Sequence, residues 1–299
     1  MIKRTLYFGN PCYLNKKQDQ LMVSFPEEGL EPKSVPIEDI GIVMLDNPQI
    51  TITQALLTAV SENNAVIINC NDKHLPHALM LPTASHSAYT EKLRFQLESS
   101  LPLRKNLWQQ TVSAKINNQA ALLNYFGTET ENMQYWAKNV KSGDPDNMEA
   151  RAAAFYWGKY LEGFQRQRFG EPPNNLLNYG YAILRAVVAR SLVASGMLPA
   201  LGIHHRNKYN PFCLADDVME PFRPWVDKLV MEICGENEDI EELSPDLKRA
   251  LLSIPVLDIL IDKQKSPLMV GVQRTTASLM QCFEGTIRKI AFPEFEFLR

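Results

Sequence analysis

Short apolar runs dominate the first part of the chain, and longer helical patterns dominate the rest. Residues 21, 23 and 25 alternate with polar neighbours, as in a half-buried strand, whereas residues 40–45 are continuously apolar, as in a buried one. Residues 16–19 are polar and predict a hairpin loop. The predicted strands are 4–9, 12–15, 20–25, 40–45 and 65–70, with one short helix at 52–61. Strand patterns then stop, and prolines with small polar residues indicate a boundary at 81–87.

From residue 89 onward, apolar residues recur at three- and four-residue spacing, which predicts helices. The segment 175–196 is strongly apolar and is predicted to be the core helix of this half, capped at its end by Gly196. Asp144 and Pro145 predict a helix start, with Asp144 as the N-cap residue. The predicted helices are 90–100, 105–126, 148–169, 175–196, 214–234, 247–253 and 267–291, with a strand at 257–262.

The helix at 214–234 contains Pro221 and Pro224, so we predict a kink or a restart near residue 222. Together the two patterns define an α+β fold. A β-rich N-terminal domain covers residues 1–84, and a larger all-α C-terminal domain covers residues 85–299.

The composition is that of a globular protein, with 45% hydrophobic and 22% charged residues. No run approaches 18 consecutive apolar residues, so we expect no membrane span. The N-terminal MIKRTLYFGN reads as a strand rather than as the apolar core of a signal peptide, and we expect a cytoplasmic protein. Five scattered cysteines without a C-x-x-C pair argue against structural zinc and a disulfide framework, and predict free buried thiols.

The net charge of −3 does not exclude a nucleic-acid partner. Seven acids and no base lie between Glu232 and Asp246, and removing these seven charges from −3 leaves +4 on the remainder. An acid run of this kind is usually a solvated loop or helix face. The overall charge therefore says little about the partner.

Residues 202–225, GIHHRNKYNPFCLADDVMEPFRPW, crowd polar side chains together after the apolar helix at 175–196. Asp217 and Glu220 are three residues apart on a predicted helix and project from one face, whereas Asp216 points away. The preceding turn could bring His204 or His205 over that face. An imidazole with one or two carboxylates suits Mg²⁺ or, because of the nitrogen ligand, Mn²⁺. The alternative is that acids at a helix N-terminus only complement the helix dipole.

Glu149 is the candidate for a further carboxylate ligand. Small residues at 152–154 follow it and would let another helix approach, although taken alone Glu149 fits a solvent-facing residue better. Basic residues, Arg151, Arg206 and Arg223 among them, gather near the same segments. Bases around a metal site fit phosphodiester chemistry, and solvated helix faces would give the same pattern. No H-E-x-x-H, Walker A, G-x-S-x-G or G-x-G-x-x-G motif occurs, which excludes the corresponding enzyme classes.

A family resemblance rests on three segments that follow one another along the chain. They are EARAAAFYW from Glu149, LNYGYAILRAVVARSLVASGMLPALGIHH ending at His205, and NPFCLADDVMEPFRP around Glu220. With these segments the chain resembles the type II form of the CRISPR-associated adaptation integrases, which insert new spacers into CRISPR arrays. The resemblance spans the whole chain, including the β-rich and the helical part.

The resemblance implies that Glu149, His205 and Glu220 are the catalytic residues and ligands of Mg²⁺ or Mn²⁺. The second histidine of the pair takes the ligand position, and His204 is the weaker candidate. Asp217 matches a further acid of the family, which is expected to support the ligands or to hold a second ion. In some branches an Asp stands where Glu220 is here. Arg151, Arg206, Arg223 and Asn178 are expected to contact DNA, the arginines because they adjoin the proposed ligands.

The implied reaction is transesterification, in which a 3′-OH of a protospacer fragment attacks a phosphodiester at the leader–repeat junction of double-stranded DNA. The implied assembly is a homodimer pairing through the β-rich domain, with two dimers flanking a small ferredoxin-like second adaptation protein in a heterohexamer. The RNA-guided effector nuclease is a further expected partner, and a membrane is not. The competing hypothesis is a DNA-binding architectural subunit whose acids are structural.

Overall fold

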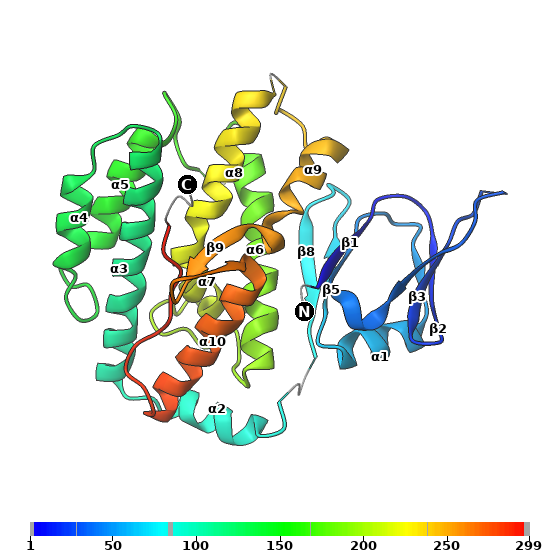
Figure 1. Cartoon of the computed structure of the whole chain (residues 1–299), viewed down its shortest axis with the longest axis horizontal. Coiled ribbons are helices and arrows are strands. Elements are labelled where there is room, and N and C mark those ends of the chain that lie inside the picture. The colour runs from blue at the N-terminus through cyan, green and yellow to red at the C-terminus, as the bar shows by residue number, and fades with distance from the viewer. Residues whose placement is uncertain (1–2, 28, 83–85, 168, 238, 296–299) are drawn as a thin grey trace. The chain divides into compact units, whose positions relative to one another are not determined.

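The computed structural model describes residues 3–27, 29–82, 86–167, 169–237 and 239–295. The chain divides into two compact units, Met1–Ser87 and Ala88–Arg299 (Figure 1). Strands lie mainly in the first unit and helices in the second, which confirms the α+β class. The boundary predicted after residue 84 falls among residues 83–85, outside the described residues.

Two sheets form the described part of the N-terminal unit. One sheet has the order β1 (Arg4–Phe8), β5 (Ile40–Leu45), β7 (Val66–Cys70), β8 (Pro76–Met80), parallel except for β8. The other has the order β4 (Lys33–Pro36), β3 (Gln20–Ser24), β2 (Tyr13–Lys17), β6 (Thr51–Ile52), antiparallel except for β6. The 3₁₀ turn η1 (Ile37–Asp39) and the helix α1 (Gln54–Glu62) complete the unit. Buried residues of β2, β3, β5, β7 and α1 share one apolar core.

The predicted strands of this unit are present, but the prediction that strands stop after residue 70 is wrong. β8 follows, and β4 and β6 were also not predicted. Pro76 is the first residue of β8, which lies at the edge of its sheet, where a missing N–H is tolerated. The hairpin loop predicted at 16–19 shrinks to Gln18 and Asp19, both with positive φ, because β2 continues to Lys17.

The helix α6 (Asn174–Ala194) is the core of the C-terminal unit, as predicted, and is buried along most of its length. It packs against α7 (Cys213–Met219), α8 (Arg223–Glu236) and α10 (Leu268–Glu284). On another side of the unit, α3 (Leu101–Tyr125) packs against α4 (Glu131–Lys138) and α5 (Met148–Tyr160) (Figure 1). The other elements of the unit are α2 (Tyr89–Leu97), η2 (Glu220–Phe222), α9 (Pro245–Leu251), η3 (Ile254–Val256), β9 (Asp258–Ile261) and β10 (Gln264–Pro267).

Two predicted helices are too long. The helix predicted at 148–169 ends at Tyr160, because Leu161 is extended and Gly163 adopts a left-handed φ of 71°. The ring of Phe164 then packs back on Tyr160. The helix predicted at 267–291 ends at Glu284, where Gly285 has a φ of 77° and terminates the helix. The helix α4 and the strand β10, which pairs with β9, were not predicted.

The remaining expectations concern membranes and cysteines. Within the described residues, no helix combines the length and the apolar character that crossing a membrane requires. All five cysteines are free thiols, as predicted, but burial is confirmed only for Cys12, Cys213 and Cys282, because Cys70 and Cys234 are half-buried.

Candidate active site

A break in one helix positions Glu220. Pro221 lies in the first turn of η2 and Pro224 in the first turn of α8, where a missing N–H is tolerated. The helix is therefore divided: α7 ends at Met219, the 3₁₀ turn η2 follows, and α8 begins at Arg223. This is the predicted restart near residue 222. Both η2 and α5 pack against α3, which directs Glu220 and Glu149 toward the same helix.

The side chain of Asp144 caps the start of the helix that carries Glu149. The helix α5 begins at Met148, after Asn147 in a left-handed conformation with a φ of 52°. Asp144 is therefore not the N-cap residue, and that prediction is wrong in position. Its carboxylate nevertheless accepts hydrogen bonds from the backbone N–H groups of Met148 and Glu149, each 2.9 Å long. Asp144 thus satisfies two free donors of the first turn and holds Glu149 there.

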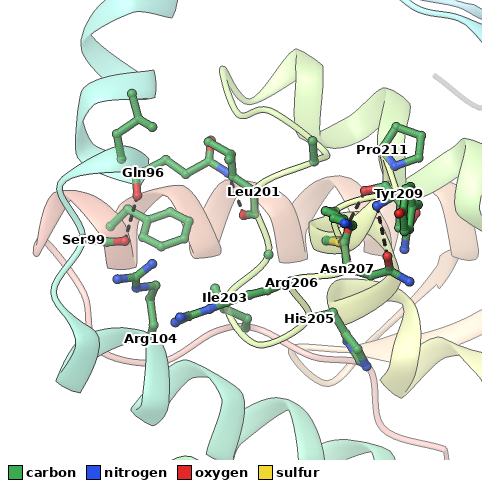
Figure 2. A pocket seen from close by; sticks show the side chains of 17 residues that line it. Gln96, Ser99, Arg104, Leu201, Ile203, His205, Arg206, Asn207, Tyr209 and Pro211 are labelled. Atoms are coloured by element: carbon green, nitrogen blue, oxygen red, sulfur yellow. Dashed lines mark hydrogen bonds between the residues drawn. The ribbon is translucent and has the colours of Figure 1, made fainter.

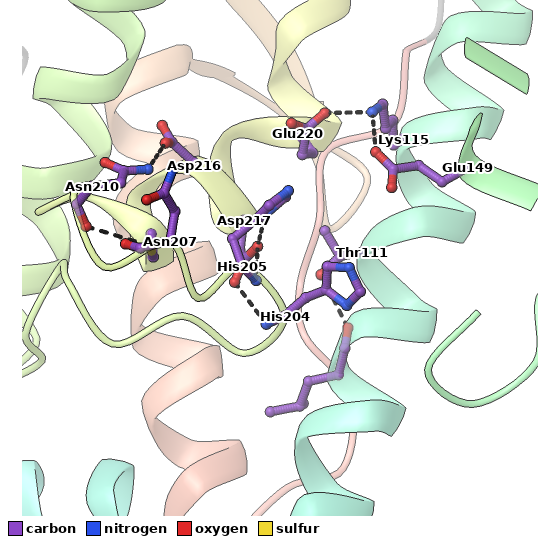
Figure 3. A network of polar contacts seen from close by, with 12 residues as sticks. Thr111, Lys115, Glu149, His204, His205, Asn207, Asn210, Asp216, Asp217 and Glu220 are labelled. Carbon is purple, nitrogen blue, oxygen red and sulfur yellow. Dashed lines mark hydrogen bonds and ion pairs between the residues drawn. The ribbon is translucent and has the colours of Figure 1, made fainter. Parts of the chain in front are cut away.

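A buried lysine joins the two glutamates. The Nζ atom of Lys115, on α3, lies 2.7 Å from Glu149 Oε1 and 2.6 Å from Glu220 Oε2 (Figure 3). The Lys115 side chain is only 8% exposed. Burial alone would lower its pKa, but Glu220 and Glu149 raise it, so the ammonium stays charged. Two of the predicted ligands, from different helices, therefore share one cation.

Arg223 neutralises the other side of Glu220. Its Nη2 atom lies 2.9 Å from Glu220 Oε1. Burial alone would raise the pKa of Glu220, but Arg223 and Lys115 hold it below its usual value. The guanidinium of Arg223 also lies over the ring of Tyr181, 4.8 Å from its centroid. Glu220 is thus ionised and fixed by two cations.

Behind Arg223 lies a buried network of tyrosines. The hydroxyls of Tyr156 and Tyr181 both donate to the carboxylate of Asp227, the former at 2.7 Å. The hydroxyl of Tyr160 donates to the Asp227 carbonyl oxygen at 2.7 Å. Burial raises the pKa of Asp227 to about 6, although the hydrogen bonds of the tyrosines oppose that shift. The network fixes the ring that supports Arg223.

His205 is held by Asp217. The Nδ1 atom of His205 lies 2.5 Å from Oδ1 of Asp217, which is fully buried. This hydrogen bond raises the pKa of His205 against the effect of partial burial, and the charges of Asp217, Glu220 and Glu149 act in the same direction. Because Nδ1 faces a carboxylate, Nε2 is the ring nitrogen left for another partner.

The loop around His205 is closed tightly onto α7. The backbone N–H groups of His204 and His205 donate to Asp217 at 2.9 and 3.3 Å. A Cβ atom on Gly202 would lie 2.4 Å from the His205 carbonyl oxygen and 2.8 Å from Asp217 Oδ2, so only glycine fits there. The ring of His204 stacks on Trp108 at a centroid distance of 4.1 Å, and burial and His205 lower its pKa.

The other predicted site residues have diverse surroundings. Asp216 turns away from the glutamates, as predicted, and pairs with Arg185 Nε at 2.7 Å. Asn178 accepts a hydrogen bond of 2.7 Å from Arg166, whereas Arg151 and Arg206 are exposed.

Lys115 and Trp108 were not predicted from the sequence. Both are buried on α3, seven residues apart. Because polar residues such as Asn118 and Gln119 are buried on the same helix, the sequence carries no apolar stripe that would have pointed to them.

The donor set can be compared with the requirements of a divalent cation. Across the described residues, no three His, Cys, Asp or Glu side chains are spaced to hold a metal ion. Glu149 and Glu220 already bind one cation between them, however, and Glu220 Oε2 accepts no well-directed hydrogen bond from the described residues. Two carboxylates beside an oriented imidazole are ligands that suit Mg²⁺ or Mn²⁺. The chemical types of these ligands therefore fit such an ion.

A cavity of about 730 Å³ adjoins His205 (Figure 2). Its lining includes the basic residues Arg104, Arg206 and Lys208, together with Tyr209 and Asn207. A concave surface with positive charge and an aromatic ring, next to an acidic site, suits a polyanion with planar bases.

Comparisons with known proteins agree on one family. A family model described as CRISPR associated protein Cas1 matches residues 6–254. A CRISPR-associated endonuclease Cas1 from Neisseria meningitidis serogroup C (strain 8013) is 36% identical over 281 residues, covering 93% of this chain and 91% of that protein. A solved casposase bound to integration product has a TM-score of 0.81 at 19% identity, covering 100% of this chain and 96% of that one. A solved Cas6-RT-Cas1–Cas2 complex has a TM-score of 0.73 at 17% identity, covering 96% of this chain and 35% of that one. At these identities the structural likeness shows the fold alone.

Proposed function

The chain belongs to the Cas1 family of CRISPR-associated proteins, and from that premise we propose that it is a metal-dependent DNA endonuclease and integrase of CRISPR adaptation. In the proposed reaction a 3′-OH of a protospacer fragment attacks a phosphodiester at the leader–repeat junction. A new P–O bond forms, the original P–O bond breaks, and the proton of the attacking hydroxyl leaves while the departing 3′ oxygen gains one. A second attack joins the other strand. The relative at 36% identity is named an endonuclease, which supports nuclease chemistry.

One observation carries the proposal: Glu149 and Glu220 meet at a single buried cation, beside an imidazole that Asp217 orients. Purely structural acids do not require a neighbouring histidine fixed in one tautomer. In the proposal Glu149, Glu220 and Nε2 of His205 hold Mg²⁺ or Mn²⁺. When bound, the ion would stabilise charge on the phosphate and favour ionisation of the 3′-OH, so no protein nucleophile is needed.

The residues around the ligands keep the site in position. Asp217 sets the tautomer of His205, and Arg223 fixes Glu220 from its other oxygen. Arg206 lines the adjoining cavity and Arg151 is exposed, so both are placed to bind phosphates in the proposal. Arg223 and Asn178 already contact protein groups, which restricts them to DNA contacts made alongside those bonds.

The proposed partners follow from family membership. Double-stranded DNA is the substrate, and the β-rich unit pairs two copies into a homodimer. The likeness to a Cas1–Cas2 complex supports a small second adaptation protein as partner in a heterohexamer. The type II character, the effector nuclease as a further partner and a cytoplasmic location belong to the same proposal.

A second candidate is an architectural DNA-binding subunit without catalysis of its own. The observation in its favour is that Lys115 and Arg223 already neutralise the glutamates, as in a structural ion-pair cluster. This candidate predicts DNA binding by the purified chain without metal-dependent strand transfer.

Strand transfer into a plasmid carrying a leader–repeat, with and without the small partner, separates the two candidates. We expect products with Mn²⁺ or Mg²⁺, none in EDTA, and none from Glu220→Gln or His205→Ala. Matched controls are Glu131→Gln and His77→Ala, which change exposed residues of the same types and are expected to keep activity. Full activity in EDTA or in both ligand variants would sink the proposal.

A further inference from the structure

The charges inside the site are already balanced. Glu149 and Glu220 contribute two negative charges, and Lys115 and Arg223 contribute two positive ones. Next to them, Nδ1 of His205 is hydrogen-bonded to Asp217. Because a buried charge is costly unless it is paired, a divalent ion added to this cluster would leave it with an excess of positive charge.

Lys115 also occupies the space that an ion shared by the glutamates would need. Its Nζ atom lies 2.7 Å from one carboxylate and 2.6 Å from the other (Figure 3). An ammonium and a metal ion cannot both lie between the same two oxygens. One of them has to leave, and the lysine is attached through a flexible stem of four carbons.

Lys115 and Glu220 form an ion pair without a well-directed hydrogen bond. Glu220 Oε2 accepts no well-directed hydrogen bond from the described residues, although the ammonium lies close to it. The other oxygen of Glu220 is held by Arg223, which does not contact Glu149 in the described ion pairs. Removing the ammonium therefore leaves Glu220 fixed while it frees one oxygen of each carboxylate.

We propose that Lys115 is an internal cation that the divalent metal ion must displace, so that the protein alone holds the ion weakly. This inference rests on the proposed function, since it takes Glu149 and Glu220 as ligands. Once displaced, the ammonium needs another anion, and a DNA phosphate at the site supplies one. Lys115 would thus couple retention of the metal ion to the presence of DNA, which limits nuclease activity in its absence.

The test measures the affinity of the full chain for Mn²⁺ without DNA. The electron paramagnetic resonance signal of the free ion reports how much Mn²⁺ remains unbound. Lys115→Met and Lys115→Gln both remove the charge, and Gln keeps hydrogen-bond donors for the glutamates if the Met variant does not fold. We expect either variant to bind Mn²⁺ at least about tenfold more tightly than the wild type, because a buried like charge is gone. Lys105→Met, which changes an exposed lysine of the same helix, should bind as the wild type does.

A double variant, Glu149→Gln with Glu220→Gln, defines binding outside the site. If the wild type and the Lys115 variants bind above this background with equal affinity, or the variants bind more weakly, the role given to Lys115 is wrong while metal binding stands. If no chain exceeds the background, the metal site of the proposed function fails as well. In the wild type, DNA with a 3′-OH end should tighten Mn²⁺ binding more than it does in Lys115→Gln, and an equal effect would contradict the coupling.

Discussion

Replacing Asp217 by Asn tests whether this carboxylate organises the histidine. Asp217 is fully buried and receives three donors, Nδ1 of His205 at 2.5 Å and the backbone N–H groups of His204 and His205 at 2.9 and 3.3 Å. An Asn side chain has one acceptor oxygen, so its NH₂ group must face at least one of these donors. Each donor left unsatisfied costs about 1–3 kcal/mol.

This cost acts on the position of His205 more than on the global fold. Loss of a partner that orients a ligand typically lowers metal affinity or activity by about 10–100-fold. We expect Asp217→Asn to lower the rate of strand transfer within that range and to raise the Mn²⁺ concentration needed for half-maximal rate. His205→Ala is expected to abolish the reaction.

The assay is strand transfer over a series of Mn²⁺ concentrations, with circular dichroism to confirm folding. Asp146→Asn, at an exposed aspartate, is the control and should behave as the wild type. Wild-type rates and metal dependence in Asp217→Asn would refute the reasoning. A complete loss in a folded protein, equal to that of His205→Ala, would instead assign Asp217 to the ions themselves.

Three further changes have defined outcomes. Gly202→Ala introduces a Cβ atom 2.4 Å from the His205 carbonyl oxygen, so the loop must shift, and strand transfer should fall at least about tenfold while DNA binding persists; unchanged rates would contradict this. Asn118 donates hydrogen bonds to two backbone carbonyls and accepts one from a backbone N–H inside the helical unit. Asn118→Ala should therefore lower the free energy of unfolding, measured in urea, by about 2–4 kcal/mol. A loss below about 1 kcal/mol would show that these hydrogen bonds contribute little to stability. Burial raises the pKa of Asp227 from 3.8 to about 6, so the carboxyl loses its proton at a lower pH in the unfolded state than in the folded state. The free energy of unfolding should therefore fall by up to about 3 kcal/mol as the pH rises from 3.8 to above 6. Asp227→Asn should lack this part of the pH dependence of unfolding, and identical profiles in the two proteins would refute the burial argument.

The sequence predicted most elements because hydrophobic periodicity reports local structure. The core helix α6 and the restart of the helix at Arg223 are both direct consequences of residue type. Helix ends were less predictable, as in α5, where aromatic residues continue the helical pattern past Tyr160 while Gly163 turns the chain.

The site was only partly predictable for a similar reason. Asp217 and Glu220 are three residues apart, so their closeness could be inferred, although α7 ends at Met219 and Glu220 begins η2. Glu149 was a candidate from the small residues that follow it, and the family resemblance then implied it as a ligand. The placement of Lys115 between Glu149 and Glu220 depends on how α3, α5 and η2 pack, which periodicity does not encode. Lys115 was not singled out from the sequence, because the buried side of α3 also contains polar residues such as Thr111, Asn118 and Gln119, so no apolar stripe marks it as buried.

The central claim is that Glu149, His205 and Glu220 hold one divalent ion during strand transfer. The most direct test is a crystal structure of the chain with Mn²⁺ and DNA, measured at a wavelength where manganese scatters anomalously. The account predicts a single strong anomalous peak in contact with both glutamates and with Nε2 of His205, and the Lys115 ammonium withdrawn from between the carboxylates. Full occupancy of DNA with Lys115 still bridging Glu149 and Glu220, and no peak at these residues, would contradict it.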